Sequence, residues 1–418
     1  METAIISPVE QKAITGLYTK ASLSIVFIVC FVSTLFGGIV SMLMSVYLPV
    51  AVKDVLGNVS EDRLNNISAW INAVFIFGWM FGGFAWGFIC DKLGRARSVI
   101  LSTGFYGLFT LLTAFSPSWL LLSVCRFFSG FGIGGVLVTT TILVSELWDE
   151  KKRAVVLGIV SVAMPIGFFV AGAINNFIPD WHRAFLAGII PLALSIVSVF
   201  ILPESAKWSN QKAAATAREN SSSQLFASQY KPNLIKGSLI FGSMLIGLWA
   251  IFSWAPTWVQ SIANSAEVQQ QRGATMMILA GGGLVGSFVS GWIVNAIGLR
   301  KTMMLCFAVC FIMTFIVFKL NTSVTLTTFI EMAILAFFFG ISQGALSVYI
   351  PQLFPTAIRA SATGFCFNIG RIFTGTVVFF IGALEGILGG YGNAVFIFSF
   401  IFLVGLVVTF FSKEKSIE

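Results

Sequence analysis

Two versions of one motif stand half a chain apart: GFICDKLGRAR at residues 87–97 and GWIVNAIGLRK at residues 291–301. In both, a glycine, an acid or amide and a second glycine recur at an offset of 204 residues. A second pair, SELWDEKKRA at 145–154 and PQLFPTAIRA at 351–360, repeats at an offset of 206. The chain is therefore an internal duplication. A membrane-embedded duplication with a site between its halves is the architecture of a transporter.

The composition places the chain in a lipid bilayer. Its mean hydropathy is +0.92 and only 10% of its residues are charged, against about 25% in soluble domains. Twelve stretches of roughly 20 apolar residues are each long enough to cross a bilayer core of about 30 Å. We therefore expect an all-α integral membrane fold of twelve transmembrane helices in two pseudo-symmetric six-helix halves, residues 1–203 and 234–418, joined by a cytoplasmic linker at residues 204–233.

The basic residues predict the orientation. With a cytoplasmic N-terminus, 18 of the 25 Lys and Arg lie on the cytoplasmic side, five lie on the opposite side, and Arg126 and Arg371 lie inside spans. Because positive charge concentrates in cytoplasmic loops, both termini are expected in the cytoplasm, in a bacterial cytoplasmic membrane. The net charge of +8 predicts attraction to membrane lipids and no nucleic-acid binding. We expect a monomer.

Several motifs together resemble the major facilitator superfamily. They are the duplicated motifs, Arg126-x-x-x-Gly130-x-Gly132-x-Gly134, and Pro203-Glu204-Ser205-Ala206-Lys207-Trp208 after the sixth span. The last of these is similar to the branch that contains sugar porters and organic-ion transporters. The resemblance covers nearly the whole chain, and it implies a transporter whose halves rock around a central site.

The resemblance also implies a cytoplasmic gate, formed by Asp91, Gly94, Arg95, Glu146, Arg153 and Arg359. A carboxylate at the end of a helix can bind a neighbouring helix N-terminus, or pair with Arg95 or with an arginine across the bundle. A charged loop that only sets topology is the alternative. The second copy carries Asn295 and Gln352 in place of the two acids, which predicts a stronger latch in the first half.

Arg371 is the leading candidate for a substrate contact. Twelve residues beyond Arg359, a rise of 1.5 Å per residue puts Arg371 about 18 Å deep, near the middle of the bilayer. An arginine at that depth needs a cavity or a partner. The resemblance to organic-ion transporters implies that it serves organic anions. An arginine satisfied by helix-end carbonyls or by a buried carboxylate is the alternative.

Uncharged side chains are candidates to complete the pocket. Asn368 shares the helix face of Arg371. The other candidates are Gln343, Tyr349, Trp254, Asn72 and Tyr47, with Trp249 and Trp258. Taken singly, each residue type is more common in helix packing or at the membrane interface than in a ligand contact.

Proton coupling and conformational coupling have two candidates. Arg126 precedes three glycines and is expected to face the interior of the first half, where a conformational role and direct work on substrate or proton both stay open. The first span carries no acid, so Glu331 is the candidate to titrate. An ion pair of Glu331 with Lys319 or Arg126 is the alternative.

These patterns predict a secondary active or facilitative transporter of a small organic anion, a carboxylate, with or without a coupled proton. A neutral sugar or polyol is the alternative substrate. A transceptor that senses a substrate without net transport is the alternative from another class. The chain offers no nucleophile, metal-ligand cluster or paired acids at a common depth, so neither an enzyme nor a cofactor or metal is expected.

Overall fold

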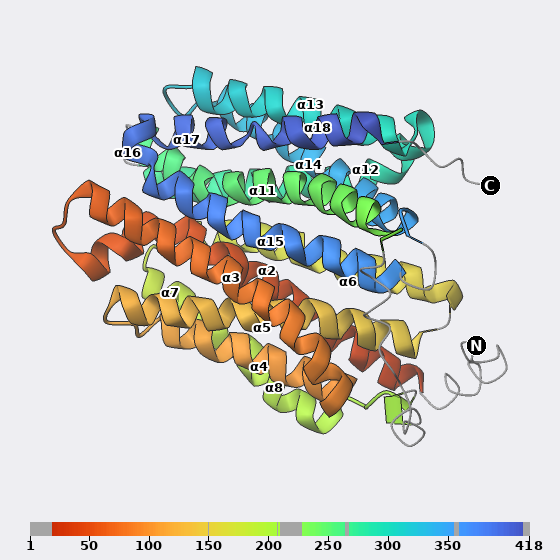
Figure 1. Ribbon diagram of the computed structural model, residues 1–418. Coiled ribbons are helices and arrows are strands. Elements are labelled where there is room, and N and C mark those ends of the chain that lie inside the picture. The colour runs from red at the N-terminus through yellow and green to blue at the C-terminus, as the bar shows by residue number, and fades with distance from the viewer. Residues whose placement is uncertain are drawn as a thin grey trace.

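The computed structural model describes residues 19–148, 150–206, 208–209, 228–263, 267–354 and 359–412. Within this part of the chain every regular element is helical. Figure 1 shows the helices as one bundle of roughly parallel rods, in which the described part of the chain begins and ends at the same end of the bundle. This end is called the terminal end below, and the opposite end is called the distal end.

Each half of the chain contributes six membrane-crossing segments. The N-terminal half contains α2 (Lys20–Leu56), α3 (Glu61–Leu93), α4 (Arg95–Thr113), α5 (Trp119–Leu147), α6 (Glu150–Phe177) and a broken segment of α7 (Trp181–Phe185), η1 (Leu186–Gly188) and α8 (Ile189–Ile201). The C-terminal half contains α11 (Lys231–Ile262), α12 (Val268–Ile297), α13 (Leu299–Phe315) with η2 (Ile316–Leu320), α14 (Leu326–Gln352), α15 (Arg359–Ala383), the short α16 (Glu385–Leu388), and a last segment of α17 (Tyr391–Phe398) and α18 (Ile401–Phe411).

Eleven of these segments are long and apolar enough to cross a membrane. The twelfth, α4, is 19 residues long and packs against α5 and α8. The structure thus confirms the predicted fold of twelve helices. Helix α11 begins at Lys231, so its first turn overlaps the end of the linker expected at residues 204–233.

The duplicated motif ends α3 and α12 in the same way. The N–H of Gly94 donates to the carbonyl of Cys90, and the N–H of Gly298 donates to the carbonyl of Val294. The two glycines have φ of 110° and 86°, a region that glycine reaches without a Cβ penalty. The next helix, α4 or α13, then begins at the following residue in both halves.

Glycines let helices within each half approach closely. A Cβ atom added to Gly130 or Gly134 of α5 would collide with backbone carbonyls of α3. In the C-terminal half, a Cβ atom on Gly286 of α12 or Gly340 of α14 would collide with the backbone of the other helix. Small residues that allow such contact drive helix association in membranes, where lipid is as apolar as the side chains. Each half is therefore tightly packed in itself.

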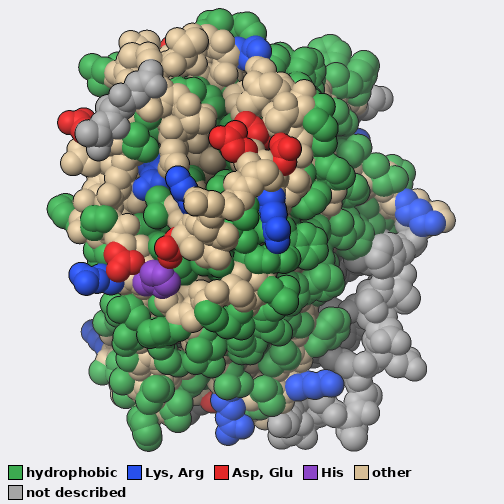
Figure 2. Space-filling model, turned by 90° about the vertical axis from the view of Figure 1, so that its left-hand side faces the viewer, with side chains coloured by type: hydrophobic (Ala, Val, Ile, Leu, Met, Phe, Trp, Pro, Cys, Tyr) green, Lys and Arg blue, Asp and Glu red, His purple; other side chains and the backbone are tan. Residues whose placement is uncertain are grey.

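The two halves meet at the distal end. Asn175 of α6 and Gln269 of α12 exchange side-chain to backbone hydrogen bonds of 2.7 and 2.6 Å. Asn65 of α3 bonds Glu385 and Tyr391 of the C-terminal half. Between described residues, all the hydrogen bonds joining the halves lie at this end, which Figure 2 views from outside. The structure is therefore closed at the distal end.

Candidate functional site

Arg371 lies in the middle of α15. Its Nη1 donates to Oδ1 of Asn368 at 2.7 Å and to the carbonyl of Phe367 at 3.5 Å. Asn368 in turn donates to the carbonyl of Gly364 at 2.9 Å, which leaves its amide oxygen facing the guanidinium. Arg371 forms no ion pair with any side chain in the described part of the chain. Its positive charge is therefore not neutralised by a described carboxylate.

Trp79 of the N-terminal half lies beside Arg371, and Trp249 of the C-terminal half lies beside Trp79. The guanidinium carbon is 5.5 Å from the ring centroid of Trp79 on α3, within the range of a cation–π contact. Trp79 meets Trp249 of α11 edge to face, with centroids 5.2 Å apart and an angle of 85°. Trp79, Trp249, Asn368 and Arg371 are called the midplane platform below. Trp79 is not predictable from the sequence, because a tryptophan inside an apolar helix carries no spacing signal of its own.

Tyr47 and Trp254 use their polar atoms within their own halves. Both are fully buried. The hydroxyl of Tyr47 donates to the carbonyl of Ile178, and Nε1 of Trp254 donates to the carbonyl of Val378 at 3.0 Å. These contacts are those of helix packing, and they leave neither side chain with a free donor.

The side-chain amides of Asn72 and Gln343 differ from Tyr47 and Trp254 in their hydrogen bonding. Nδ2 of Asn72 and Nε2 of Gln343 are buried, and neither has a hydrogen-bond partner in the structure. A buried donor without a partner costs about 1–3 kcal/mol, so both amides are suited to bind a polar group that arrives from elsewhere. Tyr349 is buried on α14.

Arg126 is buried in the N-terminal half and only 1% exposed. Its Nη1 donates to the carbonyl of Val40 at 3.2 Å. The guanidinium carbon lies 4.1 Å from the ring centroid of Phe75, and Phe75 contacts Trp79 edge to face with centroids 5.9 Å apart. A row of rings therefore connects Arg126 to the midplane platform, which favours the conformational interpretation of this residue.

Glu331 lies near the start of α14, at the distal end. Its carboxylate accepts a hydrogen bond of 2.6 Å from Nδ2 of Asn321. Lys319 instead donates to Asn393, and Arg126 contacts α2 and α3. The alternative of an ion pair between Glu331 and either basic residue is therefore wrong for this structure.

The terminal end carries a charged cluster within the N-terminal half. Arg95 donates to Asp91 at 3.0 Å and to Glu146 at 2.9 Å. Arg95 and Glu146 are nearly buried, whereas the Asp91 side chain is 72% exposed. Of the two pairings considered for Asp91, the structure contains the local one with Arg95.

The segment after α8 completes this cluster. Oε1 of Glu204 accepts hydrogen bonds from the backbone N–H groups of Arg95 and Ala96, at 2.7 and 2.9 Å. It therefore caps the positive N-terminal end of α4. Ser205 donates to Glu146, and the indole of Trp208 donates to the carbonyl of Asp91 at 3.0 Å. These contacts explain the sequence that follows the sixth span.

The second copy of the motif is built differently. Arg300 donates to the carbonyls of Thr409 and Phe410 at the end of α18. The contacts described for Arg300 thus differ from those of Arg95 in the first copy. The side chains of Arg153 and Arg359 lie outside the described residues.

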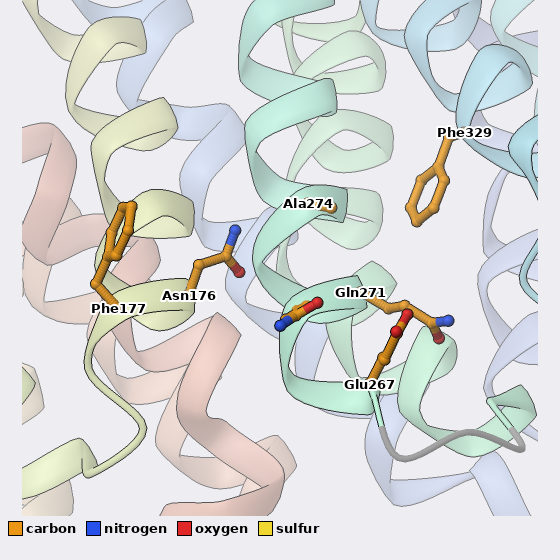
Figure 3. A pocket seen from close by; sticks show the side chains of 7 residues that line it. Asn176, Phe177, Glu267, Gln271, Ala274 and Phe329 are labelled. Carbon is orange, nitrogen blue, oxygen red and sulfur yellow. The ribbon is translucent and has the colours of Figure 1, made fainter.

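Two cavities lie at the distal end, away from Arg371. One of about 500 Å³ is lined by Asn176, Phe177, Glu267, Gln270, Gln271, Ala274 and Phe329. Figure 3 shows it between α6, α12 and α14. A second, of about 370 Å³, lies between α3 and α15–α16. Neither contains a predicted substrate residue, and we place the candidate site at the midplane platform because the unpaired charge is there.

Comparison with known proteins identifies the family. Residues 25–375 match the Major Facilitator Superfamily, and the chain belongs to that family. It is a membrane transporter and not an enzyme. The cis,cis-muconate transport protein of Acinetobacter baylyi is 27% identical over 406 residues, which cover 94% of this chain and 95% of the relative. The gallate transporter of Pseudomonas putida is 24% identical and covers 83% of this chain and 82% of the relative.

Solved structures share the fold. A D-xylose–proton symporter superimposes with a TM-score of 0.77 at 16% identity, covering 93% of this chain and 97% of its own. A partially occluded, inward-open conformation of the xylose transporter XylE from E. coli gives a TM-score of 0.76 at 15% identity, covering 94% and 100%.

Proposed function

We propose that this transporter moves a small organic carboxylate across the membrane by alternating access. The observation that carries the proposal is the guanidinium of Arg371, which has no carboxylate partner among the described residues and lies beside Trp79. A guanidinium binds a carboxylate through two parallel hydrogen bonds. Tryptophan faces suit a flat, conjugated skeleton. The named substrates of the two relatives, muconate and gallate, are flat carboxylates.

A neutral sugar or polyol is the second candidate substrate. The buried, unpaired amides of Asn72 and Gln343 favour it, because amides hydrogen-bond hydroxyl groups well. The solved xylose transporters share the fold. Their identity to this chain is too low to support an argument about its substrate. A substrate-sensing transceptor would use the same platform without net flux.

We infer the remaining roles from position. The two halves, residues 1–203 and 234–418, rock about the platform, and Asp91, Gly94, Arg95, Glu146, Arg153 and Arg359 act as the gate at the terminal end. Arg126 couples the N-terminal half to the platform. The distribution of basic residues supports cytoplasmic termini, a bacterial cytoplasmic membrane and contacts with lipid headgroups. The transporter acts as a monomer, with or without a coupled proton.

The test compares Arg371→Ala with wild type in binding of gallate, its uncharged amide analogue and xylose to purified protein by calorimetry. Loss of the charge-assisted bonds should weaken gallate binding by about 2–4 kcal/mol, or about 30- to 1000-fold. Arg371→Lys keeps the charge without the planar fork and should recover part of the loss. The preference for gallate over its amide should disappear in Arg371→Ala.

The matched control is Arg63→Ala, which removes an exposed arginine at the distal end and should leave binding unchanged. A folded Arg371→Ala variant that binds gallate as wild type does would refute the carboxylate proposal, and tight binding of xylose alone would favour the sugar. Uptake of radiolabelled gallate into proteoliposomes separates a transporter from a sensor, because a sensor binds without flux.

A further inference from the structure

Three side chains connect α3 of the N-terminal half to α16 and α17 of the C-terminal half at the distal end. Nδ2 of Asn65 on α3 donates to Oε2 of Glu385 on α16 at 2.6 Å. The hydroxyl of Tyr391 on α17 donates to Oδ1 of the same asparagine at 2.6 Å. Asn65 thus uses both ends of its amide to hold the C-terminal half. Asn65, Glu385 and Tyr391 are called the distal latch below.

The latch brings acidic groups from both halves together. Glu61 and Asp62 occupy the first turn of α3. A Cβ atom added to Gly386, the residue after Glu385, would lie 3.4 Å from Oδ1 of Asp62. The Asp62 carboxylate therefore faces the turn that carries Glu385, and it comes from the other half of the protein.

No basic group neutralises these carboxylates. Among the described residues, neither Glu385 nor Glu61 nor Asp62 takes part in an ion pair. Arg63, on the same turn of α3, is exposed. Lys319 of η2, which packs against α17, donates to Asn393. Tyr391 is the titratable group that α17 presents to the latch.

Burial, together with the charges of Glu61 and Asp62, raises the pKa of Glu385 above its ordinary value of 4.5. Burial is the larger cause. The two opposing carboxylates come from the other half, so their effect depends on the closed distal end. When the halves separate there, Glu385 moves away from these charges and its pKa falls toward the ordinary value.

Protons can reach this place from solution. The distal cavity of about 370 Å³ is lined by Asp62, Asn65, Asn66, Gly382, Ala383, Gly386 and Ile387. These residues flank Glu385 on both sides of the contact between the halves, and Figure 2 shows acidic side chains gathered beside a hollow on this end.

We propose that Glu385 is a proton-binding site whose protonation stabilises the closed distal end of the transporter. A protonated carboxyl still accepts the hydrogen bond from Asn65, and it removes the repulsion from Glu61 and Asp62. The closed state binds the proton more tightly than the open state, so the proton shifts the population toward closure.

The sign follows from the two pKa values. At a pH above the raised pKa, Glu385 is ionised in both the open and the closed state. Closing the distal end is then opposed by the full repulsion from Glu61 and Asp62. As the pH falls through that pKa, protonation favours the closed state, until the pH also passes the pKa of the open state. Because the proton enters from the distal side and leaves to it on reopening, the site gates the cycle without itself carrying the proton across the membrane.

The experiment measures the distance between spin labels on the full chain in lipid nanodiscs. Labels at Ser60→Cys and Thr322→Cys, in a background without the six native cysteines, report opening of the distal end between about pH 5 and pH 8. One unit of pKa difference between two states changes their ratio by about tenfold. For wild type, the ratio of open to closed molecules should rise about 3- to 30-fold with pH.

Glu385→Gln should stay closed and lose this response, changing by less than about twofold, because its neutral amide still accepts from Asn65. Asp62→Asn removes one opposing charge from an exposed side chain, so the response should shrink and its midpoint should move to lower pH. This second variant keeps the test decisive if Glu385→Gln does not fold.

The matched control is Asp180→Asn, which neutralises another distal carboxylate that pairs with Arg183 within its own half. It should keep the full wild-type response. A wild type without pH response, a Glu385→Gln variant that retains it, or an Asp180→Asn variant that loses it would overturn the proposal.

Discussion

Trp79 is the residue through which the N-terminal half reaches Arg371. It contacts the guanidinium on one side and Trp249 of the other half on the other. Any movement that separates the halves at mid-depth must break this edge-to-face contact. Trp79 is therefore placed both to hold a flat ligand and to sense whether the site is filled.

The corresponding variant is Trp79→Ala. It removes an aromatic contact of about 0.5–1.5 kcal/mol as well as buried area, so the affinity for gallate should fall about tenfold, with Trp79→Phe losing less. Calorimetry on the purified variants measures this. Trp292→Ala removes a tryptophan that is 63% exposed on the outer surface of α12, and it should bind as wild type does. Equal affinity in Trp79→Ala and Trp292→Ala would remove Trp79 from the site.

The position of a single residue can be predicted from this sequence where it depends only on the depth of that residue along its helix. The position of Arg371 follows from the helical rise after Arg359. That Asn368 shares a helix face with Arg371 follows from their spacing, and the two side chains form a hydrogen bond of 2.7 Å. Trp79 could not be found in this way, because its contact depends on how α3 and α15 lie against each other. For the same reason the alternative partners suggested for Glu331 were wrong.

Between helices, the glycine contacts of α3 with α5 determine how rigid the N-terminal half is. A side chain on Gly134 would have to displace the carbonyl of Trp79. This would push α3, the helix that carries Trp79 of the midplane platform, away from α5. The contact therefore affects both the stability of the half and the geometry of the site.

Gly134→Ala should destabilise the protein by about 1–3 kcal/mol, the usual cost of overpacking, and should lower the apparent unfolding temperature in detergent. Gly158→Ala is the matched control, because nothing lies within 4 Å of a Cβ atom at Gly158. That change should be neutral or slightly stabilising, since alanine favours a helix over glycine by up to about 1 kcal/mol. Equal unfolding temperatures in the two variants would contradict the close packing described above.

Elements were predictable because hydropathy and helix length are local properties. The twelve spans are confirmed, including α4, whose composition is the least apolar by the same measure. The cap formed by Glu204 on α4 was not predictable, since it joins residues more than a hundred positions apart. The family resemblance singles out the sequence that contains Glu204, but it does not predict these hydrogen bonds.

The whole molecule has one closed end and a charged cluster at the other. In this state the described contacts of Asp91 are with Arg95 of its own half and with Trp208 of the segment that follows that half. The exposed carboxylate is therefore available to a partner when the terminal end closes. No reading of one sequence predicts which end is closed, because the same residues must serve both states.

Asp91→Asn should therefore slow transport more than it weakens binding. A loss of about 1.4 kcal/mol from the closed terminal end would reduce turnover about tenfold, with the dissociation constant of gallate unchanged. Uptake into proteoliposomes and calorimetry measure the two quantities. Asn295→Ala, at the duplicated position where Arg300 bonds backbone carbonyls instead, should affect neither. A large loss of affinity at normal turnover would place Asp91 in the binding site and not in the gate.

The cap on α4 has a mechanical consequence for the connection between the halves. Because Glu204 and Trp208 are fastened to the N-terminal half, the chain that crosses to α11 begins beside Asp91. The start of that connection therefore moves together with the N-terminal half when the halves rock. Among the described residues, the contacts that can synchronise the halves are the side chains that touch between them: the distal latch, the pair of Asn175 and Gln269, and the midplane platform.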